Sequence, residues 1–221
     1  MAEFIFLGNK LYIFSTTVVF SIDLVTKERK EVILPSHNKV PVIRAPYKQK
    51  DTIYFTGDNV VFTITASEKV EVFNSQIALF GSNFFPKLFN YQEELYLLIY
   101  DNVLNENHFF IKYENDFVPV EFTNELKNNR IITILENKED LWFCTSNGVI
   151  ILNKNKKQFF LKEVIFKNDF ITKCIIDENE TVWFSTLNNG IFIVPSLNIK
   201  SYKNVVNNEI ISVVEKSPLQ T

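Results

Sequence analysis

The sequence predicts an all-β protein built as a β-propeller, and three observations carry this prediction. A unit of similar sequence occurs five times along the 221 residues. The copies are spaced at close to the roughly 40 to 45 residues of one four-stranded propeller blade. The chain is also rich in Phe, Tyr, Val and Ile, which pack well on a pleated, half-buried surface. We therefore expect about five four-stranded blades plus one extra strand.

Each copy of the unit starts with an aliphatic residue and an aromatic residue, followed by a short apolar run, a polar turn and a second apolar run. Successive copies begin 42, 42, 46 and 41 residues apart, at Leu11, Ile53, Leu95, Leu141 and Val182. A helical repeat is disfavoured, because no ten-residue stretch shows the 3.6-residue period of an amphipathic helix. We place the repeats in a single propeller of residues 1–221, at about residues 4–35, 41–74, 86–122, 130–162 and 170–203.

The four strands are clearest in repeats four and five. In repeat four we predict strands at residues 131–135, 141–145, 148–152 and 158–161. In repeat five the same order gives strands at residues 171–176, 182–186, 190–194 and a weaker 199–202. Repeat three has an insertion, residues 101–107, that we place between its second and third strands. The extra strand lies at residues 209–216, where 210–215 match 131–136 position by position.

Composition narrows the classes of partner. The chain has 23 Lys and Arg against 26 Asp and Glu, and the two signs are interspersed. Nucleic acid is not an expected partner, because phosphate binding needs a concentrated basic face. The sequence has no run of 18 apolar residues and no basic, cleavable leader, so we expect no signal peptide, no transmembrane segment and no membrane contact by this segment.

Repeats four and five share an apolar strand that ends in an acidic residue, a polar turn, a Trp preceded by Leu or Val, and a small residue before Thr. These segments, residues 134–148 and 175–186, resemble the two-component regulator propeller repeat. They depart from it at Glu139 and Glu180, which stand where a turn glycine is usual. The resemblance is clear over about residues 130–200 and faint before them, where Tyr replaces the Trp.

The resemblance implies the sensor domain of a bacterial hybrid or histidine kinase receptor, on the periplasmic or extracellular side. It implies a small, saccharide-like ligand, with self-association or other receptor domains as further partners. It implies no catalysis and no cofactor. Two alternatives stay open: a protein-interaction scaffold, and a propeller lyase of the streptogramin-inactivating type, which would use a histidine beside metal-binding acids.

The extra strand leaves two ways of ending the ring. Residues 210–214 either pair with the first repeat and close a five-bladed ring, or begin a sixth repeat of an arc. In the second case the arc belongs to a larger propeller, of which seven blades are common in this family. We favour the arc, because residues 210–215 are in register with the start of a new repeat.

Propellers bind ligands where the loops between second and third strands and between blades converge. The amide, acid and guanidinium groups on these loops suit hydrogen bonding to a neutral polyol. No catalytic residue and no metal site is predicted, because no histidine is grouped with another ligand in the sequence. The candidate ligand-binding residues are His37, Asn38, Asp101, Asn102, His108, Arg130, Asn147, Asn188 and Asn189.

Other recurring residues are interpreted as structural. The aromatic at the second position of each unit is expected to fill the wedge between blades; these residues are Tyr12, Tyr54, Tyr96, Trp142 and Trp183. Cys144 and Cys174 occupy small-residue positions and are expected to be buried, reduced and unpaired. Glu136, Asp177 and Glu215 end first strands and are expected to accept backbone N–H groups of turns.

Overall fold

The computed structural model describes residues 2–35, 42–57, 60–73, 84–114, 116–155, 158–195, 199–206 and 209–216. These ranges are almost entirely antiparallel β-structure, with one four-residue helix, α1 (Asn124–Lys127). Five sheets follow one another along the chain, and we call them blades 1 to 5. A separate two-stranded hairpin follows blade 5.

Blades 1 to 4 each contain four consecutive strands. Blade 1 consists of β1 (Glu3–Leu7), β2 (Lys10–Phe14), β3 (Val19–Asp23) and β4 (Arg29–Val32). Blade 2 consists of β5 (Ile43–Gln49), β6 (Thr52–Gly57), β7 (Val60–Thr65) and β8 (Val70–Phe73). Blade 3 consists of β9 (Phe84–Tyr91), β10 (Glu94–Asp101), β11 (Glu106–Tyr113) and β12 (Asp116–Pro119). Blade 4 consists of β13 (Ile131–Asn137), β14 (Asp140–Thr145), β15 (Gly148–Asn155) and β16 (Gln158–Ile165).

The remaining strands differ from the predicted order. Blade 5 has three strands, β17 (Ile171–Ile176), β18 (Val182–Thr186) and β19 (Ile191–Val194). The hairpin consists of β20 (Ile199–Val206) and β21 (Glu209–Lys216). The prediction that residues 199–202 form a fourth strand of repeat five is therefore wrong. Pairing with β21 joins eight residue pairs, whereas β19 is only four residues long and offers a much shorter ladder.

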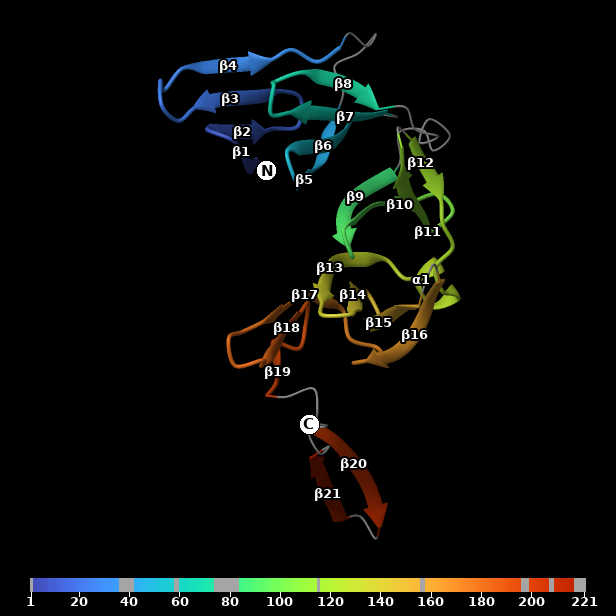
Figure 1. Cartoon of the computed structure of the whole chain (residues 1–221). Helices are drawn as coiled ribbons and strands as arrows, with labels where there is room; N and C mark the ends of the chain where they lie inside the picture. The colour runs from blue at the N-terminus through green and yellow to red at the C-terminus, as the bar shows by residue number, and fades with distance from the viewer. Residues whose placement is uncertain are drawn as a thin grey trace.

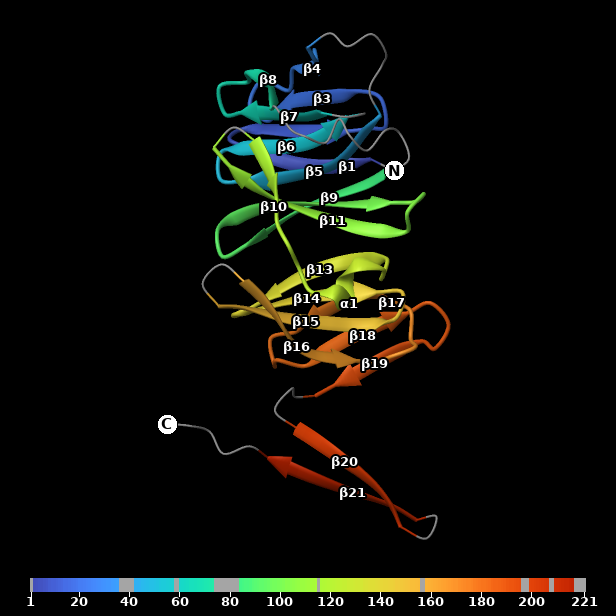
Figure 2. The same cartoon turned by 90° about the vertical axis from the view of Figure 1, so that its right-hand side faces the viewer.

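The blades are arranged as an open arc (Figure 1). The first strands, β1, β5, β9, β13 and β17, line its inner side, and each contacts the first strand of the next blade. Figure 2 shows the same sheets stacked one after another. β21 pairs with β20 and not with β1. The structure therefore does not show the closed five-bladed ring, which was one of the two predicted ways of ending the propeller.

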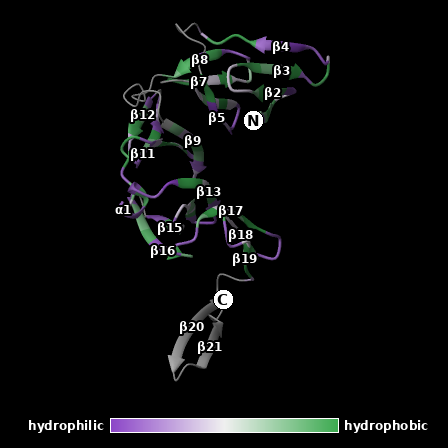
Figure 3. Ribbon diagram, turned by 180° about the vertical axis from the view of Figure 1, so that it is seen from behind, coloured by the Kyte–Doolittle hydropathy of each residue, from purple (hydrophilic) through white to green (hydrophobic). Residues whose placement is uncertain are grey.

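The core lies between blades. The described residues form four apolar clusters, one at each interface between consecutive blades. Figure 3 shows hydrophobic residues concentrated in the strands. The predicted wedge aromatics Tyr12, Tyr54, Tyr96 and Trp142 are buried in these clusters, as expected. Trp183 is only half-buried, and for this residue the prediction is wrong.

The predicted insertion of repeat three lies between its second and third strands, as expected. Asp101 is the last residue of β10 and Glu106 the first residue of β11, so residues 102–105 form the turn of a long hairpin. The extended strands are stabilised because both bury apolar side chains in the neighbouring interfaces. Residues 120–130, which include α1, connect blade 3 to blade 4 and account for further length.

Candidate functional site

A cavity of about 620 Å³ lies on the inner side of the arc. It is lined by the first strands of three consecutive blades, together with Glu3 at the start of β1. The lining segments are residues 45–47 of β5, 86–90 of β9 and 132–136 of β13. This volume is within the range of small-molecule sites. The inner cavity is therefore the candidate site.

The local sequence explains why these first strands open toward a cavity. The ladder between β5 and β6 is irregular between Arg44 and Tyr47, where Ala45 has a φ of 49° and Pro46 follows it. Proline cannot donate to a ladder and is tolerated in an edge strand or a bulge. Pro86 occupies a similar inner-edge position in β9. The ladder of β13 is also irregular, between Ile131 and Thr133.

Charged groups lie at the end of the cavity where the first strands begin. Lys87 is half-buried, and its pKa is lowered by burial and by the neighbouring positive charge of Arg130. Burial raises the pKa of Glu3, and the charge of Lys87 opposes this shift. Lys87 and Glu3 thus influence each other across the cavity, although no ion pair within 4.0 Å joins them in the described residues.

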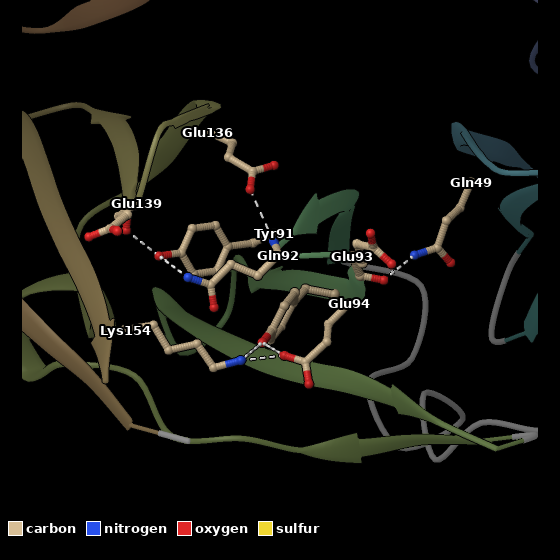
Figure 4. Close-up of polar contacts among 9 residues, drawn as sticks. Gln49, Tyr91, Gln92, Glu93, Glu94, Glu136, Glu139 and Lys154 are labelled. Atoms are coloured by element: carbon tan, nitrogen blue, oxygen red, sulfur yellow. Dashed lines mark hydrogen bonds and ion pairs between the residues drawn. The ribbon is translucent and has the colours of Figure 1, made fainter. Parts of the chain in front are cut away.

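The opposite end of the cavity is braced by hydrogen bonds between blades (Figure 4). Gln49 of blade 2 donates from Nε2 to Oδ1 of Asn90 at 2.8 Å. It also donates to the Glu93 carbonyl at 2.9 Å. The Gln92 backbone N–H donates to Oε1 of Glu136 in blade 4 at 3.0 Å. Glu136 accepts a backbone N–H as predicted, but from the neighbouring blade. Asp177 accepts the N–H groups of its own turn, from Asn179 and Thr181.

A second set of contacts fixes blade 3 against blade 4 on the same side. Lys154 is paired with Glu94 and also donates to the Tyr96 hydroxyl at 3.1 Å. The Tyr96 hydroxyl donates to Glu94 at 2.7 Å, and burial together with this carboxylate raises the pKa of Tyr96. The Tyr91 hydroxyl donates to the Glu139 carbonyl. These contacts hold the spacing of blades 2 to 4 and so the width of the cavity.

Several predicted loop residues make turn contacts. Asp101 accepts the N–H groups of Val103 and Leu104 at 2.7 and 3.1 Å, and Asn102 is exposed in the same turn. This geometry is that of an Asx-turn.

The structure brings predicted residues of blades 4 and 5 to one connecting segment. Asn147 accepts the Asn168 N–H at 3.0 Å, and Asn189 donates from Nδ2 to Asp169 at 2.6 Å. Asn188 is exposed beside Asn189 in the turn between β18 and β19. These asparagines shape the connection between the blades.

The remaining predicted residues separate from one another. His108 is in β11 and lines a different cavity, of about 480 Å³, at the outer part of blade 3. Arg130 lies directly before β13, at the same end of the inner strands as Lys87, with its guanidinium carbon 6.0 Å from the centre of the Tyr100 ring. His37 and Asn38 lie outside the described residues. The nine candidates therefore do not form one site.

Sequence reasoning missed Glu3, Tyr47, Lys87 and Asn90, because it searched the loops and not the inner strands. A signal was available. Lys87 pairs with Leu98, two residues after Tyr96, the aromatic of its unit. Glu3 pairs with Phe14, two residues after Tyr12, and so has the same place in blade 1. A comparison of this position across the repeats would have shown charged residues on a strand that faces the centre.

Comparison with solved structures decides the architecture. The extracellular domain of the hybrid two-component system BT4673 from B. thetaiotaomicron aligns with 99% of this chain at 16% identity and a TM-score of 0.59. The corresponding domain of BT3049 aligns with 89% at 14% identity and a TM-score of 0.59. Streptogramin B lyase aligns with 86% at 13% identity and a TM-score of 0.55. The fold is a β-propeller fold.

The chain aligns with only part of these larger extracellular domains. The chain covers 28% of the BT4673 domain and 26% of the BT3049 domain, against 66% of the lyase. No family model and no curated protein matches the sequence. The extracellular domains of two-component systems are the kind of protein that the repeat motif predicted, and at 16% and 14% identity the structural likeness to them shows a shared fold.

Within the described part of this propeller, no group of three His, Cys, Asp or Glu side chains is placed to hold a metal ion. None of its helices is long and apolar enough to cross a membrane.

Proposed function

We propose that this propeller is the ligand-sensing part of a bacterial signalling receptor and binds a small, saccharide-like molecule in the inner cavity. The observation that carries the proposal is the cavity itself, whose walls come from three successive blades. A ligand that contacts all three walls would bias their relative positions, because differential contact is what shifts a conformational equilibrium. The similar extracellular domains of two-component systems support a signalling role on the periplasmic or extracellular side.

The lining suits a polyhydroxylated ligand. Tyr47, Asn90 and Thr133 supply hydroxyl and amide groups, while Leu88, Phe89 and other side chains of the same strands supply apolar surface. Binding sites for small molecules combine such an apolar lining with a few polar groups that fix orientation.

Amide hydrogen exchange with and without a panel of mono- and disaccharides tests the proposal. We expect one member to protect amides of β5, β9 and β13 while leaving the outer strands β8, β12 and β16 unchanged. The turn between β3 and β4 serves as an internal control, because it joins the two outer strands of blade 1 and none of its residues lines the cavity. Protection confined to outer strands, or none with any saccharide, would contradict the proposal.

A scaffold role is favoured by a separate observation, the apolar side chains on the outer faces of the two end blades. Phe4 and Phe6 of blade 1 are 62% and 57% exposed, and Ile191 and Ile193 of blade 5 are 64% and 51% exposed. Exposed apolar patches mark contact surfaces. We propose that further receptor domains or a second copy cover them. Sedimentation of the chain and of Phe4→Ser/Phe6→Ser tests this, since the variant should lose any self-association.

The lyase alternative would require a histidine beside metal-binding acids. His108 lies in the outer cavity of blade 3, away from the residues that line the inner cavity. The propeller is therefore proposed to bind without catalysis, and unchanged concentration of the bound saccharide after long incubation is the measurement that checks it.

A further inference from the structure

The outer cavity of blade 3, of about 480 Å³, lies beside the part of β11 that β12 does not cover. The ladder between β11 and β12 ends where Pro119 pairs with Phe110, and the Val120 N–H then donates to the Phe109 carbonyl at 2.9 Å. Because the chain leaves the sheet after this point, the first residues of β11 stand beside a hollow instead of a neighbouring strand. The sequence thus creates the cavity where the outer strand ends at a proline.

Asn107 lines this cavity and has a buried oxygen without a partner. The residue is only 6% exposed. Its Nδ2 donates to the carbonyl of Leu126 at 2.6 Å and to that of Asn129 at 2.7 Å, and these two hydrogen bonds fix the amide group. Its Oδ1 has no hydrogen-bond partner among the described residues. A buried oxygen of this kind destabilises the fold, because it has lost its water and gained nothing in return.

Thr123 brings a second such oxygen to the same cavity. It is the residue directly before α1, where the side chain of a threonine usually accepts a backbone N–H of the helix. Here the hydroxyl makes no capping hydrogen bond, and its buried Oγ1 has no partner in the described part of the chain. Thr123 as a whole is half-buried, so a change of χ1 rotamer can turn the hydroxyl toward the cavity. Two unpaired oxygens therefore belong to one hollow.

The rest of the cavity lining is mainly apolar and aromatic. Phe109 and Phe122 both line the cavity and stack on each other, with ring centres 4.0 Å apart. Further apolar surface comes from Phe110, Pro119 and Val120. The charged residues of the lining are exposed, and one of them, Lys127, is paired with Glu106 at 3.4 Å. A molecule that fits this lining is therefore uncharged, with an apolar body and a polar group for the two oxygens.

We propose that the outer cavity of blade 3 binds a small aromatic alcohol of the phenol class, whose hydroxyl lies between Asn107 and Thr123. A hydroxyl group carries one donor and two acceptor lone pairs. It can therefore donate to Oδ1 of Asn107 and accept from the Thr123 hydroxyl, while the ring contacts the aromatic wall. This site goes beyond the proposed function and does not depend on it, because none of its lining residues lines the inner cavity.

Titration of the full chain with phenol, followed by saturation-transfer NMR, tests this site. Anisole is the matched probe, because it keeps the aromatic ring but has a methyl ether in place of the O–H donor. We expect phenol to bind the wild-type chain at least about tenfold more tightly than anisole, which is the factor for one hydrogen bond to a buried acceptor. Val120→Trp should abolish the binding of phenol, because the larger side chain fills the cavity.

Thr123→Val tests the polar end of the site, since a variant of Asn107 would also lose the two hydrogen bonds of its amide group. It should weaken the binding of phenol by about fivefold or more. Without phenol it should melt at or above the wild-type temperature, because valine removes an unpaired buried hydroxyl. Thr172→Val is the matched control in blade 5. Its hydroxyl donates to the Ser185 carbonyl at 3.0 Å, so this variant should melt at a lower temperature and keep the wild-type affinity for phenol.

Several results would overturn this site. Equal affinity for phenol and anisole would do so, as would phenol binding that Val120→Trp leaves intact. Unchanged phenol affinity in Thr123→Val, with a lower melting temperature, would show that the hydroxyl has a structural role only. No binding of phenol would leave water as the partner of the two oxygens. None of these results bears on the proposed sensing function, because the saccharide panel is read out on the inner strands.

Discussion

Blades 4 and 5 have the most similar sequences of the molecule, yet the same motif residue has different surroundings in each. Trp142 is 1% exposed and stacks on Phe184, with ring centres 6.1 Å apart. Its indole N–H has no hydrogen-bond partner among the described residues. Trp183 is half-buried and donates from Nε1 to Asp177 at 3.0 Å. One motif therefore supports a buried wedge in one blade and a hydrogen-bonded surface residue in the next.

The difference in burial between the two tryptophans comes from the blades that lie next to them. Blade 4 contributes to an apolar cluster on each of its two faces, one shared with blade 3 and one with blade 5. Blade 5 contributes to only one such cluster in the described part of the chain, and Ile175, Ile191 and Ile193 of its other face are more than half exposed. The motif therefore determines the strand and the register, and the adjacent blade determines burial.

The largest expected effect compares the two tryptophans. Trp142→Ala should destabilise the fold by about 3 to 5 kcal/mol, the range for deleting a buried large aromatic. Trp183→Ala should cost less, about 1 to 2 kcal/mol, since it loses one hydrogen bond and partial burial. Urea unfolding of both variants measures the difference. Equal losses would mean that blade 5 has a neighbour in solution that covers Trp183.

The turn glycines that follow β14 and β18 also differ in packing, and again the residue of blade 4 is the more closely packed one. A Cβ on Gly148 would lie 2.6 Å from the carbonyl oxygen of Ile165, and its φ is +99°. Gly190 has a φ of +73° with no atom within 4 Å of such a Cβ. Gly148→Ala should therefore cost about 2 to 4 kcal/mol. Gly190→Ala should cost about 1 kcal/mol, from backbone strain alone. Thermal unfolding of the pair checks this order, and the reverse order would contradict the packing of blade 4.

A smaller effect concerns the charge of Asp177. The hydrogen bond from Trp183 lowers its pKa, and the N–H groups of Thr181 and Asn179 add to the shift. Because the folded pKa is below the unfolded one, the contribution of this carboxylate to stability is present above the ordinary aspartate pKa of 3.8 and is lost as pH falls through the folded pKa. Asp177→Asn should thus be less stable than wild type at pH 7 and approach it near pH 3. A constant difference across this range would show that the charge is not involved.

The smallest expected effect concerns the interface between blades 4 and 5. Cys144 of β14 and Cys174 of β17 are buried, and the Cys174 thiol donates a hydrogen bond to Cys144. This bond and burial raise the pKa of Cys174, so both factors slow its alkylation. We expect no label in the native protein and two labels after unfolding without reductant. Rapid native labelling would mean that blades 4 and 5 separate readily.

The sequence alone determined the local structure and its repetition. The alternation of apolar residues placed β2, β6, β10, β14 and β18 correctly, because these strands are fixed by nearby residues and by hairpin turns. It also identified the recurring aromatics and both buried cysteines, since a residue that occupies an equivalent place in each repeat reports the packing common to all blades.

Only the tertiary structure decided what depends on contacts between distant segments. The loop residues Asp101, Asn147 and Asn189 proved to shape turns and connections, whereas the inner cavity is formed by strands some 40 residues apart in the chain. The pairing of β20 with β21 and the partial exposure of Trp183 likewise follow from which segments meet in space. Hydrophobic periodicity specifies the face of a strand, but the partner of that face is selected by packing, because burial is a property of two surfaces together.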